Sequence, residues 1–195
     1  MSYNFSSLVI VFLLFVVSSY AIPAQQVNDI CRQSKNPSFC VTFLNSKPNA
    51  NLYTLTQYTI EVVSVNVTNT IKLINKLISQ SANDSEAKRH YQSCLVHFGY
   101  NEGALGDVDT AQELLKKKDY RGVNVAASSI LTDVEDCISG ESPSDPPFPD
   151  PSILPKYAYV VDLFAEIILI LYECDFGALG WVEAFNGEEG STRSG

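Results

Sequence analysis

The chain has 195 residues, a formal net charge of −9 at pH 7 and a pI of about 4.6. This length predicts one domain with one hydrophobic core. The acidity excludes a nucleic-acid-binding protein, because binding to phosphates needs clustered Lys and Arg. It fits a basic protein partner, and equally a surface that is simply well hydrated.

The amino terminus has the pattern of a secretory leader. Leu8 to Val17 is an uninterrupted apolar run, and Ser18-Ser19-Tyr20-Ala21 supplies small residues at the two positions that a signal peptidase recognises. We predict that residues 1–21 are a signal peptide, cleaved after Ala21, and that the protein is secreted. The run is too short to span a bilayer of about 30 Å, so we expect no membrane attachment after cleavage.

Residues 22–50 are predicted to form a hairpin of two short helices. The first helix ends near Cys31, a turn follows at Lys35-Asn36-Pro37, and the second helix carries Phe39, Cys40, Phe43 and Leu44. Neither piece is long enough to be a stable helix alone. A bridge between Cys31 and Cys40 would close the hairpin and contribute about 2 to 3 kcal/mol.

Residues 51–172 contain four long amphipathic segments, of which the first runs from Leu52 to Ser81. Its apolar residues recur at steps of three and four, which is the pattern of a helix with one buried face. That face comprises Ile60, Val63, Val67, Ile71, Ile74 and Ile78.

Two N-glycosylation motifs accompany this segment. Asn66-Val67-Thr68 and Asn83-Asp84-Ser85 fit the acceptor pattern, whereas Asn36-Pro37-Ser38 is blocked by its proline. The motifs support the prediction of secretion, and they make Asn66 and Asn83 candidate glycosylation sites.

The second long segment runs from Ser85 to Lys118 and is predicted as one helix, although Gly99, Gly103 and Gly106 weaken its middle. Its expected buried face comprises Tyr91, Cys94, Phe98, Leu105, Val108 and Leu115.

The third long segment begins after Asp119, which is expected to cap it. Its apolar residues step by four, three, four and three: Val123, Ala127, Ile130, Val134 and Cys137. Cys94 and Cys137 therefore both project from apolar stripes. A bridge between them would join two antiparallel helices and contribute about 3 to 4 kcal/mol.

The fourth long segment follows Ser142 to Pro155, which is rich in proline and predicted to be extended. The expected buried face of this last helix comprises Tyr157, Val160, Val161, Phe164, Ile167, Ile168 and Leu171. Together the segments predict an all-α protein, an up-and-down four-helix bundle over residues 51–172 with the disulfide-closed helical hairpin attached at its amino end.

Residues 173–195 fit this plan poorly. Their apolar positions have no clear period, and Gly187 to Gly195 has a composition typical of disorder. Cys174 is the odd cysteine, so we expect it to be unpaired within the domain, and free, buried or joined to another molecule.

The polar residues contain no recognisable catalytic arrangement. There is no Gly-x-Ser-x-Gly elbow, no phosphate-binding glycine loop and no HExxH motif. His90 and His97 lack the closely spaced companions of a zinc site, and Asp133, Glu135 and Asp136 are interpreted as a hydrated helix face. We expect no enzymatic activity, no metal and no cofactor, and we favour an inhibitor, carrier or interaction module.

Several short motifs surround the cysteines and the helix junctions: Ile30-Cys31, Asn36-Pro37-Ser38-Phe39-Cys40, Tyr91-Gln92-Ser93-Cys94, Lys118-Asp119-Tyr120, and Ala126 through Asp136-Cys137. Together they resemble the plant invertase and pectin methylesterase inhibitor family over residues 27–171. The resemblance implies bridges from Cys31 to Cys40 and from Cys94 to Cys137, in agreement with the pattern of the helices. It also implies an extracellular protein of the plant cell wall, the apoplast.

The junction after the second long segment distinguishes the two branches of that family. Members that block acid invertase carry a Pro-Lys-Phe element there, whereas this chain has Lys118-Asp119-Tyr120-Arg121, as is common in the branch that blocks pectin methylesterase. The resemblance therefore implies an inhibitor that occludes the active-site cleft of pectin methylesterase in a one-to-one complex. Its contact region would be exposed polar positions on the long helices Leu52 to Ser81 and Ser85 to Lys118, with individual contact residues unknown. An inhibitor of acid invertase is the first alternative, and a non-inhibitory secreted helical binding module is the second.

Overall fold

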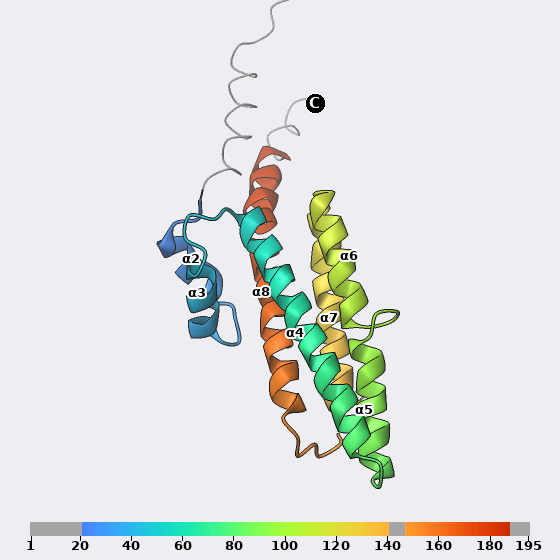
Figure 1. Ribbon diagram of the computed structural model, residues 1–195. Helices are drawn as coiled ribbons and strands as arrows, with labels where there is room; N and C mark the ends of the chain where they lie inside the picture. The colour runs from blue at the N-terminus through green and yellow to red at the C-terminus, as the bar shows by residue number, and fades with distance from the viewer. Residues whose placement is uncertain (1–20, 141–146, 188–195) are drawn as a thin grey trace, which may run out of the picture.

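The computed structural model describes residues 21–140 and 147–187 (Figure 1). Within these ranges the secondary structure consists of helices and contains no strand, which confirms the all-α prediction. The predicted leader up to residue 20, the centre of the proline-rich connection at 141–146 and the end of the tail at 188–195 lie outside the described residues.

Seven helices account for the described part of the chain. They are α2 (Ala24–Cys31), α3 (Pro37–Asn45), α4 (Leu52–Gln80), α5 (Ser85–Phe98), α6 (Ala104–Lys116), α7 (Tyr120–Ser139) and α8 (Leu154–Gly187). In Figure 1, α4, the α5–α6 pair, α7 and α8 run alternately down and up side by side, and α2 with α3 lies beside α8. The predicted up-and-down bundle with an attached hairpin is therefore confirmed.

Side-chain caps explain where four of the helices begin. Asn36, Asn51, Asp84 and Asp119 each accept a hydrogen bond from a backbone N–H in the first turn that follows. The expected cap at Asp119 is thus present, with its Oδ1 2.9 Å from the Gly122 nitrogen. Such bonds satisfy donors that the helix itself leaves unpaired.

The bundle core contains most of the stripe residues that the sequence predicts for α4, α5, α6 and α7. Every predicted stripe residue of α7 is buried, as are four of the six in α4. The second long segment, however, is not one helix: it breaks at residues 99–103. The predicted Val108 and Leu115 are buried, together with Ala104 and Ala111, whereas Leu105, next to the break, is only half-buried.

Helix α8 differs most from the prediction. It begins at Leu154, within the connection that was predicted to be extended up to Pro155, and continues to Gly187, beyond the expected end at residue 172. Tyr157, expected to be buried, is 39% exposed. Conversely, residues outside the predicted stripe are buried, namely Leu154, Ala158, Leu163, Ala165 and Ile170. The reason is that α8 contacts α4, α7 and also α2, so it is covered on nearly all sides.

The hairpin is fixed to α8 by an aromatic contact and by polar bonds. The Phe164 ring meets Phe39 and Phe43 edge-on, with centroids 5.1 Å and 4.8 Å away. Glu166 accepts hydrogen bonds from the Ser34 hydroxyl at 2.8 Å and from the Lys35 backbone N–H at 3.0 Å. The predicted amino-terminal hairpin is thus part of the same core as the bundle.

Both proposed disulfides are present. One joins Cys31 to Cys40 within the hairpin, and the other joins Cys94 on α5 to Cys137 on α7. Cys174 belongs to neither bond and is half-buried on α8. No helix in the described ranges has both the length and the apolar character that a bilayer crossing requires.

Truncating the Phe164 side chain tests how the hairpin is held. The Phe164→Ala variant removes the ring that Phe39 and Phe43 both contact, and the expected loss is about 3 to 5 kcal/mol in the free energy of unfolding. Urea denaturation measures this loss, and amide hydrogen exchange should show the fastest exchange in α2 and α3. Tyr157→Ala, at an exposed position of the same helix, is the control; equal losses in the two variants would contradict the prediction.

Candidate protein-docking site

The break between α5 and α6 creates a segment that protrudes from the side of the bundle (Figure 1). Gly99 follows the last residue of α5, and Gly103 precedes the first residue of α6. A Cβ atom on Gly103 would collide with the His97 carbonyl oxygen, and one on Gly106 would collide with the Tyr100 carbonyl oxygen. The glycines therefore permit a close backbone approach that no other residue would allow.

Two large apolar side chains are exposed at this break. Tyr100, in the protruding segment, is 62% exposed, and Val96, in the last turn of α5, is 55% exposed. Exposed aromatic and aliphatic groups are the kind of anchor that carries binding energy in protein complexes. Val96 lies in α5 and Tyr100 follows it, within the long segment from Ser85 to Lys118.

Beside Tyr100 lies a surface hollow of about 460 Å³ that follows α6. Four carboxylates and one lysine are among its lining residues, namely Glu102, Asp107, Asp109, Glu113 and Lys117. The hollow is therefore negatively charged, which suits a basic partner surface. We call Val96, Tyr100 and the residues lining this hollow the docking surface.

One carboxyl group of the hollow is paired with a second carboxyl group below it. Asp107 on α6 and Asp133 on α7 share a hydrogen bond, and burial raises the pKa of both groups. Burial, together with the nearby charge of Asp107, raises the pKa of Asp133 to about 7. The interpretation of Asp133 as part of a hydrated face is wrong, because its Oδ2 is buried and has no hydrogen-bond partner among the described residues.

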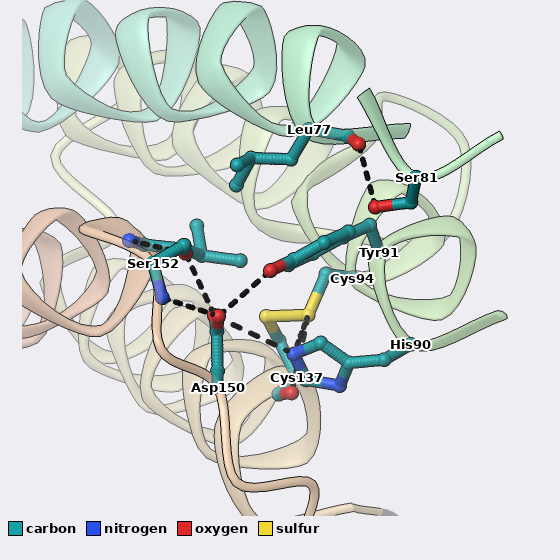
Figure 2. Close-up of polar contacts among 9 residues, drawn as sticks. Leu77, Ser81, His90, Tyr91, Cys94, Cys137, Asp150 and Ser152 are labelled. Carbon is teal, nitrogen blue, oxygen red and sulfur yellow. Dashed lines mark hydrogen bonds and ion pairs between the residues drawn. A yellow bond between two sulfur atoms is a disulfide. The ribbon is translucent and has the colours of Figure 1, made fainter. Parts of the chain in front are cut away.

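A second polar cluster lies at the start of α5, where Asp150 is surrounded by donors (Figure 2). The Tyr91 hydroxyl donates to Asp150 Oδ1 at 2.7 Å, and the Ser152 N–H donates to the same oxygen at 2.8 Å. His90 Nε2 lies 3.8 Å from Asp150 Oδ2, and its ring stacks on Phe148 with centroids 4.5 Å apart. These contacts fix the connection before α8 against α5.

The arrangement of this cluster is not that of a nucleophilic site. The Ser152 hydroxyl donates to Asp150 Oδ2 at 3.0 Å and accepts from the Leu154 N–H, so His90 does not activate it. Burial lowers the pKa of His90, although the nearby Asp150 charge opposes this effect. Within the described residues no group of three or more metal-binding side chains comes together.

The remaining residues singled out from the sequence are not part of the docking surface, although Lys118 and His97 each follow one of its residues in the chain. Lys118 is in the left-handed region at φ 60° and forms the tight turn from α6 to α7, which Asp119 then caps. His97 is buried in the last turn of α5. Asn66 lies in the middle of α4, and Asn83 lies in the exposed turn between α4 and α5.

The fold and the surface together define a disulfide-bonded helical protein whose exposed features suit protein binding. The plant invertase/pectin methylesterase inhibitor family model matches residues 25–153. This match spans more than half of the chain, so the chain belongs to that family.

Individual relatives agree with this assignment. Pectinesterase inhibitor 1 of Arabidopsis thaliana is 34% identical over 130 residues, covering 66% of this chain and 72% of the relative. The pectinesterase inhibitor of Actinidia deliciosa is 25% identical over 173 residues, covering 84% and 88%. The crystal structure of a mutant form of a pectin methylesterase inhibitor from Arabidopsis superimposes with a TM-score of 0.63 at 27% identity, covering 74% of this chain and 93% of that one. These relatives are inhibitors, which confirms the expectation that the protein is not an enzyme.

Sequence reasoning did not find Val96 and Tyr100. A usable signal was present, because Val96 stands outside the apolar stripe of Tyr91, Cys94 and Phe98, and Tyr100 stands between two glycines. A large apolar residue outside the buried stripe, next to a helix break, indicates an exposed anchor.

Substituting Gly103 tests the backbone at the docking surface. In Gly103→Ala the added methyl group meets the His97 carbonyl, so the segment must shift, and we expect a loss of about 1 to 3 kcal/mol. Thermal unfolding measures the loss. In the comparison variant Gly122→Ala the three atoms nearest to the added carbon belong to the side chains of Asp119 and Leu114 and not to the backbone, so we expect the smaller loss there, although Asp119 caps α7. A loss no greater at Gly103 than at Gly122 would refute the steric argument.

The carboxyl pair predicts a dependence of stability on pH. Because the folded pKa of Asp133 is raised to about 7, its contribution is fully present below pH 3.8 and is lost as the pH rises through 7. The free energy of unfolding of the unaltered protein should therefore fall by about 1 to 2 kcal/mol over this pH range, a modest value because the carboxyl groups are partly exposed and screened. In Asp133→Asn we expect this fall to be absent. Asp107→Asn should act in the same way. Denaturation between pH 4 and pH 8 measures the free energy of unfolding. If it fell with pH as much in both variants as in the unaltered protein, the pair could not be the cause.

Proposed function

We propose that this protein is a secreted inhibitor of pectin methylesterase, and that it acts by covering the active-site cleft of the enzyme with its docking surface. The observation that supports this most directly is the exposed pair Val96 and Tyr100 beside the acidic hollow, on a chain of the inhibitor family. No catalytic group of its own is needed for this action. The inhibitor only has to exclude the substrate.

The charge and the shape of the docking surface support a protein partner. Stable interfaces bury about 1,600 Å² in total and depend on a few central aromatic or aliphatic anchors. Tyr100 and Val96 supply such anchors, and the carboxylates of the hollow supply a charged rim. A rim of this kind guides a basic partner into place and orients it more than it adds to affinity.

Pectin methylesterase is favoured over acid invertase as the target. The two relatives from Arabidopsis thaliana and Actinidia deliciosa are both named pectinesterase inhibitors. The junction Lys118-Asp119-Tyr120-Arg121 lacks the Pro-Lys-Phe element that the resemblance associates with invertase inhibition. The non-inhibitory binding module has no comparable support, and the apolar leader supports delivery to the extracellular space, the apoplast.

Titration of target enzymes tests the proposal as a whole. The oxidised, leader-free protein is added to a plant pectin methylesterase and to a plant acid invertase, at weakly acidic and at neutral pH, and residual activity is recorded. We expect stoichiometric loss of esterase activity alone. Loss of invertase activity alone would overturn the choice of target, and loss of neither would favour a non-inhibitory module.

The role of the docking surface is tested by removing its anchors. We expect Tyr100→Ala to weaken inhibition about tenfold or more, because an anchor at the centre of an interface is worth at least about 1.4 kcal/mol. Val96→Ala should weaken it by less. The control is Tyr159→Ala, another exposed tyrosine, 47% exposed on α8. Inhibition constants and circular dichroism are measured for all three, and equal inhibition by Tyr100→Ala and Tyr159→Ala would exclude this surface.

A further inference from the structure

The two N-glycosylation motifs lie in opposite structural settings. We propose that the mature protein carries an N-linked glycan on Asn83 and none on Asn66. This inference rests on the proposed secretion, because the modification takes place in the secretory pathway, but it does not depend on which enzyme is inhibited. A glycan on the Asn-x-Ser/Thr pattern is bulky and needs a surface position.

Asn83 meets the requirements of an acceptor. It lies in the exposed turn at 81–84 that joins α4 and α5, at the lower tip of the bundle in Figure 1. The cap of α5 is made by its neighbour: Asp84 Oδ1 accepts from the N–H groups of Glu86 and Ala87 at 3.1 Å and 3.0 Å. A sugar on Asn83 therefore leaves the cap in place. Ser85, the third residue of the motif, is exposed as well.

Asn66 does not meet them. It lies in the middle of the 29-residue helix α4 and is half-buried. Its side-chain Nδ2 atom donates a hydrogen bond to the Val62 carbonyl at 2.8 Å. Its backbone carbonyl accepts a hydrogen bond from the Thr70 hydroxyl, also at 2.8 Å. Nδ2 is the atom that would bear the sugar. The folded helix therefore already uses the group that glycosylation would modify.

The chemistry makes this difference concrete. In the transfer, Asn Nδ2 loses one proton and forms a bond to C1 of the first sugar. The bond from that carbon to a phosphate oxygen of the donor, a lipid-diphosphate-linked oligosaccharide, breaks, and the lipid diphosphate leaves. At Asn83 the product extends from the tip into solvent. At Asn66 the oligosaccharide would have to fit beside a half-buried position of α4, and Nδ2 would keep only one N–H, which the bond to Val62 requires.

The position of Asn83 also separates the glycan from the docking surface. The 14 residues of α5 lie between the turn and the break that carries Tyr100, a length of about 20 Å at 1.5 Å per residue. Asn66 is 14 residues before the end of α4, so it lies at about the height of that break in the antiparallel bundle. A glycan on Asn83 should therefore leave inhibition unchanged.

Expression of the full chain with its leader in a plant secretory host tests the site. The secreted protein is treated with peptide N-glycosidase, and peptide mass mapping identifies the modified asparagine. Four variants remove the two motifs separately: Asn83→Gln and Ser85→Ala for one, and Asn66→Gln and Thr68→Ala for the other. We expect a single glycosidase-sensitive mass shift that disappears in the first two variants and persists in the last two.

Several results would overturn the proposal. They are a shift that survives in Asn83→Gln, a shift lost in Asn66→Gln, and a secreted protein without any glycan. Failure of secretion is recognised separately by an intact Met1 in the cell fraction, and it would also overturn the proposal. Esterase inhibition by the leader-free protein is measured independently, so a failed inhibitor and a failed glycan site give different results. We expect the inhibition constants measured before and after glycosidase treatment to agree within twofold.

Discussion

Between Leu154 and Leu171, helix α8 carries buried apolar side chains on nearly every side, so two neighbouring helices alone would not cover it. Helices α4 and α7 cover part of its surface, and the hairpin covers another part through Phe39 and Phe43 against Phe164. The bond between Cys31 and Cys40 then matters beyond the hairpin, because it holds together the cover of the central helix. The amino-terminal hairpin is a structural requirement of the core.

The opposite side of the bundle has fewer such demands. Helix α6 packs mainly through small and medium side chains, including Ala104, Val108 and Ala111, whereas α5 buries the larger Tyr91 and Phe98. The chain breaks between the two helices at residues 99–103, and the bond from Cys94 to Cys137 holds α5 against α7. Exposed apolar groups can be carried there without loss of core packing. The fold thus places the surface proposed to bind the enzyme on the side of the bundle away from the amino-terminal hairpin (Figure 1).

Periodicity in the sequence was sufficient to predict the class of fold and the buried stripe of α7, because the stripe depends on spacing within one helix. The cysteine pairing was also predicted, because Cys94 and Cys137 lie on the apolar stripes of two helices and Cys31 and Cys40 lie on either side of one short turn. Periodicity failed where the outcome depends on neighbours. Tyr157 fits the apolar period but lies on an exposed side of α8. Asp133 was predicted to be hydrated, whereas the fold places it beside Asp107, a contact that the spacing within α7 does not indicate. The glycines at 99, 103 and 106 indicated weakness in a helix, but only the close backbone contacts explain why the helix ends there. The exposure of Tyr100 follows from that break.

The two titrating clusters at different heights of the bundle also govern how many protons are exchanged when the protein unfolds. The folded pKa of Asp133 is raised, so this group releases protons on unfolding between pH 3.8 and about 7. The folded pKa of His90 is lowered, so unfolding makes it take up protons below about pH 6.5. Just below pH 6.5 the uptake by His90 opposes the release from Asp133, so fewer protons are released on unfolding than Asp133 alone would give. Near that pH, a change in the pH of the surrounding medium therefore shifts the folding equilibrium less than it would if only the Asp107–Asp133 pair titrated.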